Sequence, residues 1–128
     1  RYVDISFKAL FNPDCSWWNP KAPPKQKDYI LEHEQIHFAL TELSARRLNR
    51  QYRQSLLDYI AVGSTAEEIR AELVEKAKKV LQQGMQNDLQ MHTRFDEDTS
   101  MFYDREKQQE WLNRVIRELE EEEEKTAE

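Results

Sequence analysis

The sequence predicts a mostly helical α+β fold, with three long helices behind an N-terminal β-strand or small sheet. Over three long stretches, apolar residues recur at three- and four-residue steps, the period of a helix with one buried face. Near the N-terminus, Val3, Ile5 and Phe7 alternate with polar residues, which is the period of a half-buried strand. Only two residues are glycine, which argues against a turn-rich all-β fold.

The length of 128 residues indicates one domain, covering residues 1–128, with a single core. Because the chain starts at Arg1 rather than Met, we expect further residues before it in the full protein. A charged fraction of 34% against a hydrophobic fraction of 38% indicates helices with wide solvated faces. The net charge of -6 gives no general attraction to nucleic acid. No apolar run is long enough to span a membrane.

The N-terminal strand cannot form a sheet alone. We expect its partner to come from residues before Arg1, from the stretch that follows it, or from another chain. Pro20, Pro23 and Pro24 then predict a loop without helix or inner strand, because proline lacks a backbone N–H.

The first helix is predicted to run over about residues 28–60. Asp28 can cap its N-terminus, and Gly63 is expected to stop it. An arginine stripe on another side is interpreted as a solvated face that pairs with acidic neighbours. The residues that recur at helical steps are Ile30, Ile36, His37, Leu40, Leu43, Leu48, Tyr52 and Leu56, and the arginines are Arg46, Arg47, Arg50 and Arg53.

The second helix is predicted over about residues 66–96. The stretch from Ser64 to Glu68 has the pattern of a capping box, in which side chains satisfy the first free backbone N–H groups. Gly84 interrupts the helix and could allow a close approach by a neighbour. The predicted inward stripe contains Val74, Leu81, Met85, Leu89, His92, Asp96 and Thr99. Its two ligand-type members indicate either a buried polar network or a metal site.

The third helix is predicted over about residues 104–123. Its apolar stripe is Trp111, Leu112, Val115, Ile116 and Leu119. The acidic run at 120–124 is expected to fray into solvent because like charges repel without burying surface.

The strongest chemical signal is the His-Glu-x-x-His motif formed by His33, Glu34 and His37. Four residues advance a helix by about one turn, so the two imidazoles stack on one face, with Cβ atoms about 5–6 Å apart. This spacing suits two nitrogen ligands on one Zn²⁺. Glu34 is rotated by about 100° from His33. Its carboxylate can therefore serve as a general base for water beside the metal.

A catalytic zinc needs a third protein ligand and an open position for water. Glu42 lies about 180° around the helix from His33, so it cannot join the pair. The candidates are therefore Asp96, His92 and Asp98 on the second helix, although either aspartate could instead cap or end that helix.

Several of these residues resemble the motifs of a bacterial family of zinc-dependent proteases known as domain of unknown function 922. The stretch from His33 to Phe38, followed by Glu42 and by 45–48, resembles its pattern HEQxHFxxxExxARRL. Phe95, Asp96 and Thr99, followed by Gln108 and Trp111, are similar to its second motif, YDxxTxHG with a later Gln and Trp. The resemblance implies a zincin-like active-site helix, a Zn²⁺ cofactor and a peptide or protein substrate.

The chain departs from this pattern where the family's His-Gly falls on Met101 and Phe102. Methionine does not replace histidine on a catalytic zinc, which prefers oxygen and nitrogen ligands. We therefore prefer Asp96 as the third ligand, because it matches the family pattern and lies on the predicted inward face.

These observations favour a zinc metallopeptidase with Glu34 as general base and His33, His37 and Asp96 as metal ligands. One alternative is a degenerate metallopeptidase that acts as a binding module with little or no catalysis. A further alternative is a structural helical domain that docks partner chains. A location in the bacterial cell envelope or periplasm is a further expectation.

Overall fold

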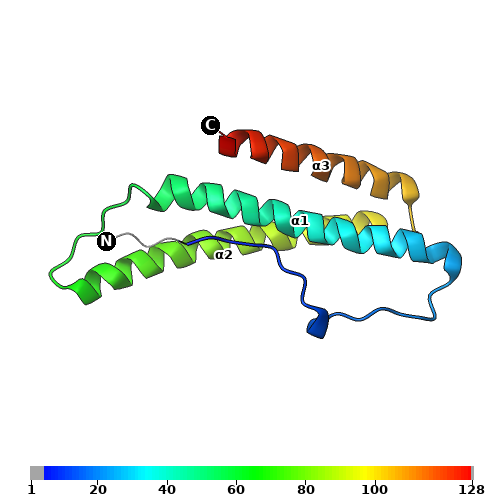
Figure 1. Ribbon diagram of the computed structural model, residues 1–128, viewed down its shortest axis with the longest axis horizontal. Coiled ribbons are helices and arrows are strands. Elements are labelled where there is room, and N and C mark those ends of the chain that lie inside the picture. The colour runs from blue at the N-terminus through cyan, green and yellow to red at the C-terminus, as the bar shows by residue number, and fades with distance from the viewer. Residues whose placement is uncertain (1–4, 128) are drawn as a thin grey trace.

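A computed structural model describes residues 5–127 and contains three long helices: α1 (Pro24–Leu56), α2 (Ala66–Thr99) and α3 (Arg105–Ala127). A short 3₁₀ turn, η1 (Pro13–Cys15), precedes them. Figure 1 shows that α1 and α3 run in the same direction and α2 in the opposite one. α1 packs against both other helices. None of the described helices is long and apolar enough to cross a membrane.

The prediction of an N-terminal strand or small sheet is wrong, since residues 5–127 contain no strand. Val3 lies outside the described residues. The alternation itself is present: Ile5 and Phe7 are half-buried, while Ser6 and Lys8 are exposed. The Phe7 backbone N–H donates to Asn49 Oδ1 at 2.8 Å, and Asn49 Nδ2 donates to the Phe7 carbonyl at 2.9 Å. A side chain of α1 thus binds this backbone as a neighbouring strand would.

The first helix is shifted towards the N-terminus relative to its prediction. It begins at Pro24, four residues before the predicted cap Asp28, and it ends at Leu56, well before Gly63. A proline is tolerated in the first turn because its missing N–H would have no partner within the helix. The carbonyl of Pro23 accepts from the N–H groups of Gln26 and Lys27 at 2.8 and 3.2 Å.

The capping box before α2 is confirmed. Thr65 Oγ1 accepts from the Glu68 N–H at 3.2 Å, and the Glu68 carboxylate accepts from the Ser64 N–H at 2.8 Å. At the other end, α2 continues to Thr99, three residues past the predicted boundary. This additional turn keeps Asp96 within the helix, so the helix controls its direction.

The inward face of α2 differs from the predicted one by about one residue, or roughly 100° of rotation. The buried residues are Gly84, Phe95 and Thr99, of which Thr99 belongs to the predicted stripe and is confirmed. Four members of the predicted stripe are instead exposed: Val74, Leu81, Met85 and Leu89. His92 is half-buried and Asp96 is largely exposed, so both lie at the edge of the packed face, where solvent reaches them.

The core around the site combines side chains from all three helices. Its buried members are Ile36 and Leu40 of α1, Phe95 of α2, and Trp111 and Val115 of α3.

Gly84 fixes the closest approach of α2 to α1. A Cβ atom at this position would lie 2.3 Å from Leu48 Cδ2 and 2.8 Å from Leu48 Cγ. Because Leu48 is itself buried, it cannot easily move aside. The glycine therefore selects the rotation of α2 that is seen.

The acidic end of α3 does not fray as predicted. The helix continues to Ala127, and Glu122 is only 2% exposed. Arg50 of α1 donates to both carboxylate oxygens of Glu122, at 2.8 and 3.0 Å, and Arg47 lies 3.6 Å away. The interpretation that the arginine stripe pairs with acidic neighbours is confirmed for these two residues. The two-point contact holds the C-terminal half of α3 on α1.

We predict that Glu122→Gln lowers the free energy of unfolding at neutral pH by about 1–3 kcal/mol. Hydrogen bonds from the Arg50 guanidinium lower the pKa of the Glu122 carboxyl below its ordinary value. A lowered folded-state pKa stabilises the protein above the ordinary carboxyl pKa, and this contribution disappears as the pH falls through the folded-state value. Urea unfolding between about pH 7 and about pH 2 should therefore show a difference from wild type that shrinks in acid.

The matched control is Glu121→Gln, since Glu121 is exposed and, among residues 5–127, its carboxylate pairs with Arg117 of its own helix alone, at 3.9 Å. This variant should unfold like the wild type at every pH. A constant difference between Glu122→Gln and wild type across the acid range would contradict the ion-pair explanation.

Candidate metal centre

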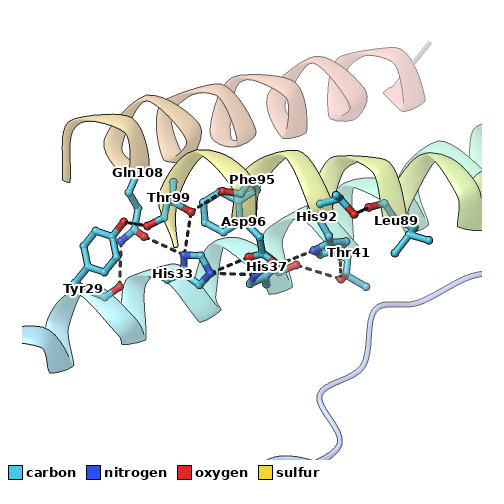
Figure 2. Close-up of polar contacts among 11 residues, drawn as sticks. Tyr29, His33, His37, Thr41, Leu89, His92, Phe95, Asp96, Thr99 and Gln108 are labelled. Carbon is cyan, nitrogen blue, oxygen red and sulfur yellow. Dashed lines mark hydrogen bonds and ion pairs between the residues drawn. The ribbon is translucent and has the colours of Figure 1, made fainter. Parts of the chain in front are cut away.

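Three ligand-type atoms from α1 and α2 meet at one point on the seam between the helices (Figure 2). His33 and His37 lie one turn apart on α1, as the motif predicts, and Asp96 comes from α2. Asp96 Oδ1 lies 3.1 Å from His33 Nε2 and 2.7 Å from His37 Nε2. The two Nε2 atoms are 3.1 Å apart. The structure thus brings together the three residues that the sequence proposes as metal ligands.

The spacing of these atoms suits a small divalent cation. Ligands about 2.0–2.1 Å from a tetrahedral zinc lie about 3.3 Å from one another. The three observed distances need to expand by about 0.2–0.6 Å to fit this geometry. The side chains of His33 and His37 are 12% and 22% exposed, whereas that of Asp96 is 49% exposed. The site is therefore enclosed on the histidine side and open to solvent on the aspartate side.

Gln108 of α3 determines which nitrogen of His33 carries its proton. The Gln108 amide nitrogen donates to the Tyr29 carbonyl at 3.0 Å and to the Glu32 carboxylate at 3.1 Å. Its oxygen must then be the atom that faces His33 Nδ1, at 3.2 Å. An oxygen acceptor requires an N–H there, so a neutral His33 has its lone pair on Nε2, towards Asp96.

Thr99 supports the same assignment. Its hydroxyl donates to the Phe95 carbonyl at 2.5 Å, which leaves its oxygen as an acceptor for His33 Nδ1 at 3.3 Å. The Thr99 side chain is fully buried, so these bonds form without competition from water.

Burial favours the neutral form of His37. Desolvation lowers the pKa of His37 below its ordinary value, although the nearby Asp96 carboxylate acts in the other direction. A neutral ring carries one proton. His37 Nδ1 lies 2.7 Å from His92 Nδ1, a contact that needs one hydrogen between the two nitrogens. When that hydrogen belongs to His37, the lone pair of His37 lies on Nε2 and faces Asp96, as that of His33 does.

Phe95 forms the wall behind both imidazoles. Its ring stacks on His33 at 4.4 Å with an interplanar angle of 21°, and it meets His37 edge-on at 4.9 Å. Phe95 is fully buried and also contacts Trp111 of α3 at 5.5 Å. The core thus restricts the rotation of both histidines before any metal is bound.

The other ligand candidates lie outside the group. Asp98 accepts a hydrogen bond from Trp111 Nε1 at 2.8 Å, so this carboxylate ties α2 to α3. His92 contacts the Nδ1 side of His37, away from Asp96 (Figure 2). Met101, at the family's histidine position, is 79% exposed in the turn after α2.

Glu34, the proposed general base, and Glu42, the glutamate excluded as a third ligand, have different surroundings. Glu34 is exposed on α1, directly after His33. Among the described residues its carboxylate has no hydrogen-bond or ion-pair partner. Glu42 instead pairs with Arg46 at 3.0 Å, away from the ligand group. Of the two, Glu34 is the carboxylate that is free to accept a proton.

Sequence reasoning did not assign roles to Gln108, Thr99 or Phe95, although all three belong to the motifs of the family resemblance. One signal was available: Gln108 stands three residues before Trp111 and extends the apolar stripe of the third helix towards its start. A polar residue on a buried stripe is expected to have a specific hydrogen-bond partner.

Comparison with protein-family models, with curated proteins and with solved structures gave no match for this chain.

Proposed function

We propose that this protein is a zinc-dependent metallopeptidase. The observation that carries the proposal is the convergence of two imidazole Nε2 atoms and one carboxylate oxygen within 3.1 Å of one another. The hydrogen bonds behind the rings leave all three atoms as acceptors when the histidines are neutral. Three acceptors at this distance repel one another unless a cation lies between them.

The alternative is a protonated histidine that forms an ordinary ion pair with Asp96. Desolvation lowers the pKa of His37 and therefore works against this arrangement. For His33, the Nδ1 proton is already engaged by Gln108, so an ion pair would need a second proton on Nε2. A divalent metal satisfies the three acceptors without added protons.

In this proposal His33, His37 and Asp96 would hold zinc, which when bound supplies a Lewis acid that polarises a peptide carbonyl and makes water more acidic. Glu34 accepts the proton of the attacking water and passes it to the leaving amine. The open side beside Asp96 provides the approach for substrate. Phe95 and Gln108 keep the imidazoles in place during the reaction.

Zinc content tests the metal centre. We expect purified untagged protein to bind about one zinc per chain. Asp96→Ala and His33→Ala should each weaken binding by more than the roughly 10–100-fold typical of residues that only contact a ligand. Glu97→Ala is the control, because Glu97 is an exposed neighbour on the same helix. A folded wild-type protein without zinc affinity, or ligand variants that bind like wild type, would overturn the proposal.

A second candidate is a module that binds zinc without hydrolysis. One observation favours it: the residue at the resembled family's histidine position is Met101, which is 79% exposed in the turn after α2 and offers no nitrogen or oxygen ligand in its side chain. Stoichiometric zinc binding without cleavage of any member of a mixed peptide library would favour this module over the peptidase.

A further inference from the structure

We propose that Asp88 and His92 form a hydrogen-bonded relay that positions His37 as a metal ligand. The inference rests on the metal centre of the proposed function and extends it to two residues of α2 that hold no metal themselves. The relay would act by fixing the ring orientation and the proton position of His37.

The relay consists of three short contacts along the α1–α2 seam. His37 Nδ1 lies 2.7 Å from His92 Nδ1, and His92 Nε2 lies 3.2 Å from Asp88 Oδ1. Ser44 of α1 donates to the same Asp88 oxygen at 2.5 Å. The side chains of His92 and Asp88 are 20% and 28% exposed. Both are therefore partly shielded from water, which would otherwise compete for these bonds.

Helix geometry explains why these residues meet. Asp88 and His92 are one turn apart on α2, as His37 and Thr41 are on α1, so two consecutive turns of each helix face one another. The rings of His37 and His92 are nearly parallel, with centroids 4.9 Å apart and an interplanar angle of 19°. The observed rotation of α2 exposes the apolar residues of its predicted stripe. The same rotation places His92 at the seam between α1 and α2.

The proton positions follow from the acceptors at the far end of the relay. A carboxylate only accepts, so His92 Nε2 must carry a hydrogen towards Asp88. The Thr41 hydroxyl donates to the His37 carbonyl at 3.1 Å, and its oxygen is therefore a second acceptor for His92 Nε2, at 3.3 Å. A neutral His92 then has its lone pair on Nδ1. The hydrogen between the two rings must belong to His37.

This pattern of hydrogen bonds leaves the His37 lone pair on Nε2, the atom that lies beside Asp96 and His33. An anionic group at the end of such a chain also makes the ligating nitrogen a better donor to a metal. His33 lacks this feature, since its Nδ1 meets the neutral amide of Gln108. His37 is thus the ligand whose direction and basicity are set by a carboxylate.

Metal titration of four variants tests the relay. With Co²⁺ as an optical probe, we expect His92→Ala to bind about 10–100-fold more weakly than wild type. His92→Gln should recover most of this loss, because its amide oxygen accepts from His37 and its amide nitrogen donates to Asp88. Asp88→Asn should show a smaller loss. Gln90→Ala, an exposed change on the same helix, is the control and should bind like wild type.

The Co²⁺ absorption spectrum separates positioning from ligation. It should keep its shape in every variant, because the ligand set does not change. A changed spectrum together with no recovery in His92→Gln would identify His92 as a ligand and overturn the relay. Unchanged affinity in all the His92 and Asp88 variants would overturn it as well.

The nitrogen chemical shifts of His37 in the metal-free protein give an independent readout. We expect a proton on Nδ1 in the wild type, and a mixture with the Nε2-protonated form in His92→Ala. A wild-type His37 protonated on Nε2 would overturn the relay whether or not the protein binds metal. Absence of metal binding with the expected Nδ1 proton would instead count against the metallopeptidase alone.

Discussion

Glu34→Gln is expected to lower peptide hydrolysis by about 10²–10⁴-fold while zinc affinity stays at its wild-type value. Glutamine has nearly the same shape but cannot accept a proton at neutral pH. Glu34 is exposed and does not belong to the ligand group, so its replacement leaves His33, His37 and Asp96 in place. Cleavage of a fluorogenic peptide library and zinc titration on the same samples measure the two effects.

Glu42→Gln is the matched control, because it makes the same chemical change on the same helix. Glu42 pairs with Arg46 and does not reach the ligand group. We expect this variant to retain full activity. Activity in Glu34→Gln equal to that of wild type would show that Glu34 is not the base, even if zinc is present.

Phe95→Ala is expected to lower the free energy of unfolding by about 3–5 kcal/mol. Phe95 is fully buried in the core cluster that also contains Ile36, Leu40 and Trp111, so truncation removes packing within this cluster and leaves a cavity. Urea unfolding of the metal-free protein measures this loss. Phe38→Ala is the control, since Phe38 is 45% exposed on α1 and should change stability far less.

A second substitution separates the packing of Phe95 from its contact with the histidines. Phe95→Leu keeps much of the apolar volume but removes the flat surface that stacks on His33 at 4.4 Å. We expect it to retain more stability than Phe95→Ala and still to bind zinc more weakly than wild type. Wild-type zinc affinity in both variants would show that the ring does not hold the imidazoles.

The helical part of the fold was predictable because local signals agree along the chain. Helix-period apolar residues indicated all three helices, and the capping box at Ser64 to Glu68 marked the start of α2. The boundaries of α1 were less accessible. Asp28 and Gly63 are good terminal signals, but Pro23 and Pro24 form an equally acceptable first turn, and local sequence does not choose between them.

The N-terminal segment shows a different limit. The alternation at Ile5 and Phe7 predicts which side chains are partly buried, and the structure confirms that pattern. It does not predict which groups form hydrogen bonds with the backbone of this segment. Asn49, a single side chain more than forty residues away, takes the place that a partner strand would occupy. No local pattern predicts such a contact, and the expected sheet is therefore absent from residues 5–127.

The sequence alone determined the helices and the pairing of His33 with His37, because one turn of a helix stacks any residues four apart. The family resemblance favoured Asp96 over His92, but only the tertiary structure shows that Asp96 lies beside the pair while His92 lies behind His37. That choice depends on the rotation of α2, which Gly84 and Phe95 set through packing against α1 and α3. Adjacent positions on a helix are about 100° apart, so the rotation of α2 about its axis decides which of its side chains face α1. Contacts between helices that are distant in sequence fix that rotation.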